Sequence, residues 1–260
     1  MLYFCPQMIK AYFQYRKKRV NAHGLHSPFA FEFYNEIIKK RKLGKQPKAE
    51  QLRKELCKRQ DLISVTDLGA GSKRNNQPRK SISSIVKNAA IPRKQGEFIS
   101  RLIDFYELKS GLELGTSLGM GTAYMALTNS NFQVKTIEGC PETALIASEN
   151  FQALKLKNVE LEVGAFDTVL DKDNAHIYDL IYIDGNHQYQ PTVDYFEFAL
   201  AHTHDTSFII FDDIHWSKEM EEAWKKIMAS PKINVSMDLF KFGLVTKRSG
   251  QRKQDFVIKF

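Results

Sequence analysis

The chain has 260 residues, of which 43% are hydrophobic and 26% charged, a composition that is typical of globular proteins and excludes a disordered chain. Its three cysteines, Cys5, Cys57 and Cys140, are odd in number and far apart, which argues against a disulfide framework and a zinc knuckle. No apolar run is long enough for a transmembrane helix, and residues 1–10 do not resemble a signal peptide. We therefore expect a cytoplasmic protein that does not bind membranes.

The formal charge of +8 is distributed unevenly along the chain. Residues 1–101 hold 23 basic and 7 acidic side chains, a charge of +16, whereas residues 102–260 hold 15 basic and 23 acidic side chains, a charge of −8. This split indicates that the two parts have different functions.

The basic first part is expected to be helical. Apolar residues within 8–13 recur at helical spacing beside the basic run 16–19. Ser27 followed by Pro28 is typical of a helix N-cap and first helical position. We interpret residues 1–93 as a basic helical N-terminal extension.

Residues 64–94 have the composition of a loop. Within them Asp67–Ser72 looks like a glycine loop, but a polar stretch that contains proline follows it instead of a helix. Long segments of this kind are structural loops or lids over a binding site. Both interpretations are open for residues 64–94.

From residue 94 to residue 260 strand-like and helical segments alternate. Strands are expected at 111–114, 133–138, 159–163, 178–184 and 207–212. Helices are expected at 119–127, 141–154, 191–201 and 216–228. This alternation is typical of a doubly wound α/β fold, in which helices cover both faces of a mostly parallel sheet. Three more strands, at 234–239, 243–247 and 255–260, are expected to add to one sheet edge in antiparallel orientation.

The most informative segment is the glycine loop, which comes between an expected strand and an expected helix. Gly115 permits a tight turn, and Gly119 lets backbone N–H groups approach a ligand. Glu138 ends the next strand, where a carboxylate can bind both hydroxyls of a ribose. The spacing G-x-x-x-G-x-G differs from the dinucleotide fingerprint G-x-G-x-x-G. With Glu113 beside it, the loop favours a zwitterionic ligand such as S-adenosylmethionine; a purely structural turn is the alternative.

Three aspartates follow two other apolar strands. Asp184 ends one strand, and Asp212 and Asp213 end another. Since the carboxyl ends of parallel strands lie at one sheet edge, these carboxylates are expected to converge there. A hard divalent cation (Mg²⁺, Mn²⁺ or Ca²⁺) would offset their repulsion. Alternatively the aspartates simply end strands, and Asp213 caps the helix near Trp216.

Histidines near these acids are candidate bases. His187 lies three residues after Asp184, and its ordinary pKa of about 6.5 suits proton removal near neutrality. It is equally interpreted as a polar loop residue. His215 is a weaker candidate, and His204 is expected to be a solvated loop residue.

These motifs, taken in order, resemble the class I S-adenosylmethionine-dependent methyltransferases, and among them the O-methyltransferase branch that includes catechol O-methyltransferase. The resemblance covers about residues 94–245. It rests on Glu113–Gly119, Ile137–Glu138, Val163–Phe166, Asp179–Asp184 and Phe211–Ile214.

The resemblance implies a Rossmann-like sheet of seven strands, of which the last is antiparallel. It implies that the methionine part of the cofactor lies near Glu113 and Gly115, the ribose on Glu138, and the adenine against Ala165 and Phe166. The full set implied to bind S-adenosylmethionine is Glu113, Gly115, Thr116, Gly119, Glu138, Gly164, Ala165, Phe166 and Asp184.

The resemblance also implies a reaction site. In the metal-dependent branch the positions of Asp184, Asp212 and Asp213 hold a divalent ion, and the position of His187 holds a lysine that acts as base. This sequence departs from that pattern twice, because Asp-Asp stands where Asp-Asn is usual and His where Lys is usual. The first 90 or so residues do not match the short N-terminal helices of that branch.

The favoured hypothesis is an enzyme that transfers a methyl group from S-adenosylmethionine to an oxygen of a small acceptor. Three interpretations of the basic extension are open: it attracts an anionic acceptor, binds nucleic acid, or packs on the acidic part of the chain. His187 and Asp184 would be its catalytic residues. Two alternatives are an RNA methyltransferase that grips phosphates with the basic extension and a non-catalytic module that binds the cofactor. A homodimer is plausible. The glycine spacing argues against a NAD-dependent dehydrogenase.

Overall fold

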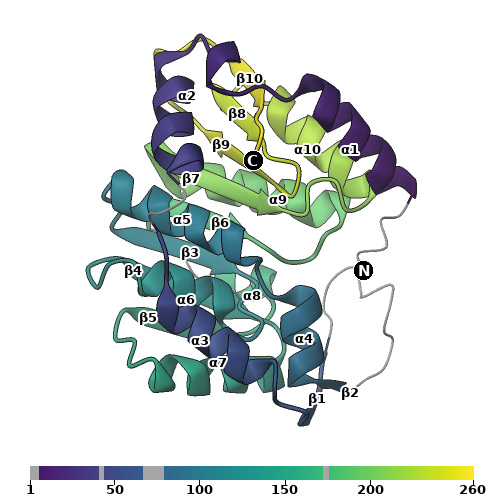
Figure 1. Ribbon diagram of the computed structural model, residues 1–260, viewed down its shortest axis with the longest axis vertical. Helices are drawn as coiled ribbons and strands as arrows, with labels where there is room; N and C mark the ends of the chain where they lie inside the picture. The colour runs from purple at the N-terminus through teal and green to yellow at the C-terminus, as the bar shows by residue number, and fades with distance from the viewer. Residues whose placement is uncertain (1–5, 41–43, 67–78, 172–175) are drawn as a thin grey trace. The chain divides into compact units, whose positions relative to one another are not determined.

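The computed structural model describes residues 6–40, 44–66, 79–171 and 176–260 (Figure 1). The chain divides into two compact units: residues 1–35 with 175–260, here called the terminal unit, and residues 36–174, here called the central unit. The expected division at residue 93 does not coincide with this one, because the N-terminal part contributes to both units. Each unit is described by itself.

The central unit is built on three parallel strands, β3 (Ser110–Leu114), β4 (Gln133–Glu138) and β5 (Val159–Val163), which lie in the order β3-β4-β5. The connecting helices are α6 (Met120–Ala126) and α7 (Pro141–Ala153), and α8 (Phe166–Leu170) follows β5. Because each strand is followed by a helix, the carboxyl ends of the strands meet at one edge (Figure 1). Glu138 ends β4 as expected.

The rest of the central unit precedes these strands. It consists of α3 (Pro47–Leu56), the antiparallel strands β1 (Leu62–Ser64) and β2 (Arg79–Ser81), α4 (Ile82–Ala89) and α5 (Arg93–Phe105). The expected loop over 64–94 is therefore partly regular. The side chain of Ser81 caps α4 by accepting a hydrogen bond from Ser84 N at 3.2 Å, and the apolar face of α4 is buried. The glycine-containing segment Asp67–Ser72 lies outside the described residues.

The terminal unit holds β6 (Tyr178–Ile183), α9 (Tyr189–Ala201), β7 (Thr203–Asp212), α10 (Lys218–Ala229), β8 (Val235–Asp238), β9 (Phe242–Thr246) and β10 (Gln254–Val257). The strand order is β10-β8-β9-β7-β6. β6 and β7 are parallel, and β9 is antiparallel to both β7 and β8, as expected. The family resemblance implied seven strands. In the described residues the two units together contain eight, β3 to β10, and the β1–β2 pair is separate from these.

The prediction that β10 is antiparallel is wrong, because β10 runs parallel to β8. The chain leaves β9 and returns to the start of β8, so that Gln254 pairs with Val235. In the same unit β9 packs closely on α10. A Cβ atom on Gly243 would lie 2.5 Å from the Trp224 ring, so this position of β9 requires glycine.

The N-terminal helices also belong to the terminal unit. They are α1 (Pro6–Lys18), a 3₁₀ turn at Ala22–Gly24 and α2 (Pro28–Phe33), and a π-helical stretch follows at Tyr34–Lys39. Ser27 caps α2 with Pro28 in its first turn, which confirms that prediction. The hydroxyl of Tyr15 in α1 donates to Ile258 O at 2.6 Å, and thereby ties the start of the chain to its end.

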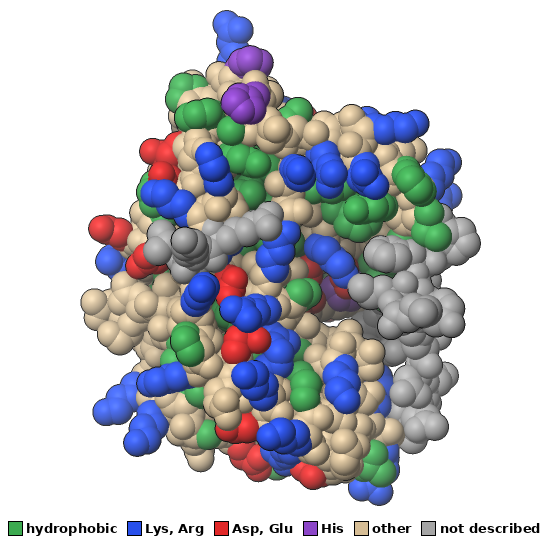
Figure 2. All heavy atoms as spheres, in the orientation of Figure 1, with side chains coloured by type: hydrophobic (Ala, Val, Ile, Leu, Met, Phe, Trp, Pro, Cys, Tyr) green, Lys and Arg blue, Asp and Glu red, His purple; other side chains and the backbone are tan. Residues whose placement is uncertain are grey.

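The outward face of α1 combines apolar and basic side chains. Phe13 is 57% exposed and Ile9 is 44% exposed, and the helix contains Lys10, Arg16 and Lys17 but no acidic residue. Figure 2 shows lysine and arginine side chains beside hydrophobic ones over this helix. The buried stripe of α1 consists of Met8, Ala11 and Tyr15.

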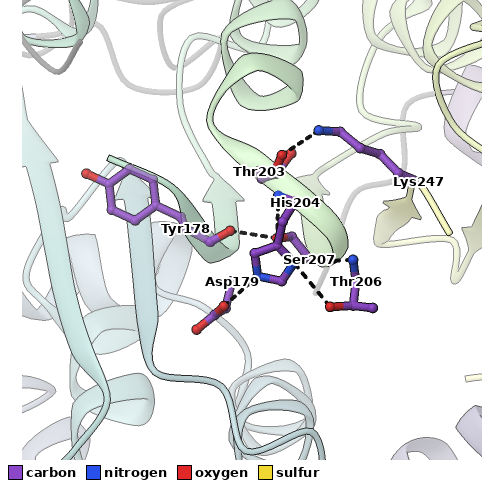
Figure 3. A network of polar contacts seen from close by, with 7 residues as sticks. All are labelled: Tyr178, Asp179, Thr203, His204, Thr206, Ser207 and Lys247. Carbon is purple, nitrogen blue, oxygen red and sulfur yellow. Dashed lines mark hydrogen bonds and ion pairs between the residues drawn. The ribbon is translucent and has the colours of Figure 1, made fainter. Parts of the chain in front are cut away.

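At its amino end β7 bulges away from β6, and polar side chains hold the bulge (Figure 3). His204 Nε2 lies 2.7 Å from Asp179 Oδ1 of β6, and the Ser207 hydroxyl donates to Tyr178 O at 2.7 Å. Lys247, the residue that follows β9, donates a hydrogen bond to Thr203 O. His204 is exposed, as expected, but it lies in a strand and not in a loop, and it is paired with Asp179.

Candidate functional site

The glycine loop between β3 and α6 has the backbone that its sequence predicts. Gly115 and Gly119 adopt positive φ angles of 105° and 79°, which favour glycine. A Cβ atom on Gly119 would also lie 2.5 Å from the Phe151 ring. The N–H of Gly119 donates to Thr116 O at 2.8 Å, so this glycine shapes the turn and its own N–H is used within the loop.

Glu113 lies behind the loop rather than on its surface. Its carboxylate accepts hydrogen bonds from the hydroxyls of Thr122 and Thr136, and Thr136 also lies 2.5 Å from the Thr116 hydroxyl. Burial raises the pKa of Glu113 to about 7, although the two threonine hydroxyls lower it. Glu113 therefore fixes the loop through threonines from β4 and α6.

Glu138 faces the same loop from the end of β4. Its Oε2 accepts the Ser117 N–H at 2.6 Å and its Oε1 accepts the Cys140 N–H at 2.9 Å. Burial raises the pKa of this carboxyl, and the backbone N–H groups oppose that effect. Ser117 adopts a positive φ of 50° in this turn.

The register of β4 and β5 places residues 164–166, the segment expected to flank adenine, beside Glu138. Glu138 pairs with Val163, and Gly164 N donates to Glu138 O at 2.9 Å. Gly164, Ala165 and Phe166 follow immediately, with Ala165 at the N-cap of α8. The central unit thus brings together, at one edge, the glycine loop, the acid expected to bind ribose and the segment expected to flank adenine.

The aspartates lie together in the terminal unit. In the parallel pair β6–β7, Ile183 is opposite Phe211, so Asp184 and Asp212 follow at adjacent positions. The Tyr182 hydroxyl lies 2.9 Å from Asp212 Oδ2 and 3.2 Å from Asp184 Oδ2. A single hydroxyl therefore joins the two carboxylates.

Asp213 has an unusual environment. It adopts a positive φ of 51°. Burial and the charge of Asp212 together raise the pKa of Asp213 to about 6, against the opposing effect of His187 and Lys241. One interpretation of the sequence was that Asp213 caps the following helix. The N-cap of α10 is instead Ser217, whose hydroxyl accepts a hydrogen bond from Met220 N at 3.1 Å.

The two histidines near these acids differ. His187 Nε2 lies 3.8 Å from Asp184 Oδ1, with 25% of the His187 side chain exposed; this is beyond hydrogen-bond distance. His215 is held between two acids, with Nε2 2.9 Å from Asp238 and Nδ1 3.4 Å from Glu221. His215 is therefore occupied by a structural contact, and His187 is the better placed candidate base.

The predicted residues fall into two sets in different units. The cofactor set, except Asp184, belongs to the central unit, and the set with Asp184, Asp212, Asp213 and His187 belongs to the terminal unit. Sequence reasoning missed Tyr182 and Lys241. In the sequence Tyr182 cannot be distinguished from the apolar residues of its strand. Lys241 lies in the turn between β8 and β9, and only the pairing of these strands brings it near Asp213.

Comparison with known proteins shows similarity to methyltransferases. Residues 112–214 match the model of a methyltransferase domain. A catechol O-methyltransferase from Niastella koreensis is 30% identical over 130 residues, which are 48% of this chain and 58% of that protein. The match therefore spans less than two thirds of that relative's length.

Solved structures share the fold. The O-methyltransferase from Bacillus cereus in complex with SAH has a TM-score of 0.54 at 24% identity, over 62% of this chain and 84% of that one. The cofactor-bound Rv0187 from MTB has a TM-score of 0.60 at 19% identity, over 79% of this chain and 91% of that one. These similarities confirm the predicted Rossmann-like α/β fold with a mostly parallel sheet. By the sequence of its middle segment and by its fold, this chain is similar to class I S-adenosylmethionine-dependent methyltransferases, and among them to a catechol O-methyltransferase.

Proposed function

We propose that the protein transfers a methyl group from S-adenosylmethionine to an oxygen atom of a small acceptor. The observation that carries this proposal is the edge of the central unit, where Glu138, the glycine loop and residues 164–166 lie together. This grouping offers an acid for ribose hydroxyls, a turn shaped by Gly115 and Gly119, and a backbone segment for adenine.

The chain's own residues would mainly bind and orient the reactants. When bound, S-adenosylmethionine supplies a methyl group that its sulfonium already activates, so alignment of the acceptor is the chief requirement. Glu138 holds the ribose, and Glu113 keeps the loop in shape through Thr136 and Thr122. His187 takes the proton of the acceptor hydroxyl, and Asp184 stabilises the imidazolium that forms.

A divalent metal was also expected, and the donor set suits one chemically, because hard cations prefer carboxylate oxygens. The arrangement does not fit an ion, however. In the described part of the chain no three or more His, Cys, Asp or Glu side chains are grouped so as to hold a metal. The Tyr182 hydroxyl joins Asp184 and Asp212 instead. We therefore derive no step of the reaction from a metal.

Replacement of Glu138 by Ala tests the cofactor site. The variant should bind S-adenosylhomocysteine at least about tenfold more weakly, since hydrogen bonds to a charged partner are lost. Isothermal calorimetry measures this directly. Glu142→Ala, an acid at the start of α7, is the matched control. Unchanged affinity in the Glu138 variant would show that the ribose lies elsewhere.

A second candidate function is methyl transfer to RNA. The observation in its favour is the outward face of α1, which presents Lys10, Arg16 and Lys17 beside the exposed Phe13. Cations bind phosphates and aromatic rings stack on bases. Filter binding of single-stranded RNA at several salt concentrations tests this candidate, with Lys17→Glu compared with Lys225→Glu on α10. Equal RNA binding by the two variants, or no RNA binding by the wild type, rules out this function.

Other predictions concern the surroundings of the protein. Within the described residues no helix has the length and apolar character needed to cross a bilayer. Cytoplasmic location, an anionic acceptor and a homodimer stay predictions. Light scattering on a size-exclusion column would measure the oligomeric state.

A further inference from the structure

Tyr182 sits between the two carboxylates that the family resemblance assigns to a metal. It is the last residue but one of β6, and its side chain is fully buried. Its hydroxyl is 2.9 Å from Asp212 Oδ2 and 3.2 Å from Asp184 Oδ2. Both distances are within the range of hydrogen bonds.

The bridge offsets the repulsion between the two acids. Asp184 and Asp212 stand at adjacent positions on neighbouring parallel strands, and two carboxylates this close repel each other. A hydroxyl donor between them stabilises their negative charge, and charge-assisted hydrogen bonds are stronger than neutral ones. One phenolic hydrogen thus performs part of the task that a cation performs in a metal site.

The bridge also obstructs a cation. Mg²⁺ requires oxygen ligands at about 2.0–2.1 Å in near-octahedral geometry, and the hydroxyl occupies one acceptor direction of Oδ2 on each of the two aspartates. The Tyr182 side chain is fully buried, so packing restricts movement of its hydroxyl away from the two aspartates.

We propose that Tyr182 is a positioning residue that joins Asp184 to Asp212 in place of a divalent ion, so that the acidic cluster of this chain works without metal. The Tyr182 hydroxyl contacts Oδ2 of Asp184, and Oδ1 of the same carboxylate lies 3.8 Å from His187 Nε2. The inference rests on the proposed function only in treating His187 and Asp184 as parts of the reaction site.

Manganese binding tests the proposal without any acceptor or cofactor. Mn²⁺ is titrated into the wild-type protein and into Tyr182→Phe, and bound ion is followed by electron paramagnetic resonance. Tyr182→Phe keeps the ring and removes only the hydroxyl. It should bind Mn²⁺ at least about tenfold more tightly than wild type, which corresponds to the loss of one hydrogen bond to a charged group. The added Asp212→Asn change should abolish this gain.

Two controls make the result specific. Tyr178→Phe removes a hydroxyl at the opposite end of β6 and should leave Mn²⁺ binding as in wild type. Calorimetry with S-adenosylhomocysteine and thermal unfolding show that each variant is folded, and they test the cofactor site separately. Equal Mn²⁺ binding by wild type and Tyr182→Phe, whether tight or undetectable, overturns the proposal, as does tighter binding by wild type.

Discussion

Strands β6 and β7 have an aspartate and a histidine near each end, and the two ends use them differently. At the amino end His204 Nε2 lies 2.7 Å from Asp179, and its Nδ1 lies 3.1 Å from the Thr206 hydroxyl (Figure 3). At the carboxyl end His187 lies 3.8 Å from Asp184. The first histidine has both ring nitrogens engaged, whereas the second makes only a long contact with its aspartate.

The difference shows why residue type alone does not identify a reaction site. The contacts at the amino end satisfy the polar groups of the β7 bulge, so they stabilise a strand irregularity. The carboxyl end instead brings Asp184 and Asp212 to one hydroxyl, and the next residue, Asp213, has a raised pKa. Groups kept in costly surroundings are typical of functional sites.

The largest expected effect is on catalysis. His187→Ala should lower the rate of methyl transfer by about 100- to 10,000-fold, the usual contribution of a general base, because the acceptor proton then has no receiver. A radiometric assay on a panel of small hydroxyl compounds would measure this. His204→Ala should keep full activity. If both variants lose activity equally, the two ends do not differ in function.

An intermediate effect is expected on stability through Asp213. The pKa of Asp213 is about 6 in the folded protein against an ordinary value of 3.8. Since the folded state binds this proton more tightly, stability falls as pH rises from about 4 to 6 and stays lower above pH 6. A difference of about two pKa units corresponds to at most about 3 kcal/mol.

Asp213→Asn removes this penalty. At pH 7 the variant should be more stable than wild type by about 1–3 kcal/mol, and at pH 4 the two should be nearly equal. Urea unfolding at both pH values gives the comparison. Glu113, whose pKa is also raised, is present in both proteins, so its contribution cancels. A variant that is less stable at pH 7 would contradict the assigned environment.

The smallest effect is expected at the amino end. Asp179→Asn weakens the contact with His204, a side chain that is 42% exposed. Exposed ion pairs contribute about 0.2–1 kcal/mol, so the free energy of unfolding should fall by no more than that, with methyl transfer unchanged. Urea unfolding and the radiometric assay check both parts. A large loss of activity would place the amino end in the reaction site.

Several features of the site were predictable because their signals are local. The glycine loop, Glu138 at the end of β4 and the aspartates at the ends of β6 and β7 all follow from strand patterns and short spacings. Ser27 could be identified as a cap because capping depends on residues within one turn. The β7 bulge at His204 gave no such signal, since an irregularity depends on the partner strand.

The sequence by itself determined the alternation of strands and helices and the chemical types of side chain at the strand ends. Only the tertiary structure decided which of these side chains are neighbours. Register set Glu138 beside Val163 and Asp184 beside Asp212, and the return of the chain made β10 parallel. The tertiary structure also placed the Tyr182 hydroxyl between Asp184 and Asp212. The physical reason is that spacing along the chain fixes the face and the end of an element, whereas pairing between distant strands depends on packing of the whole unit.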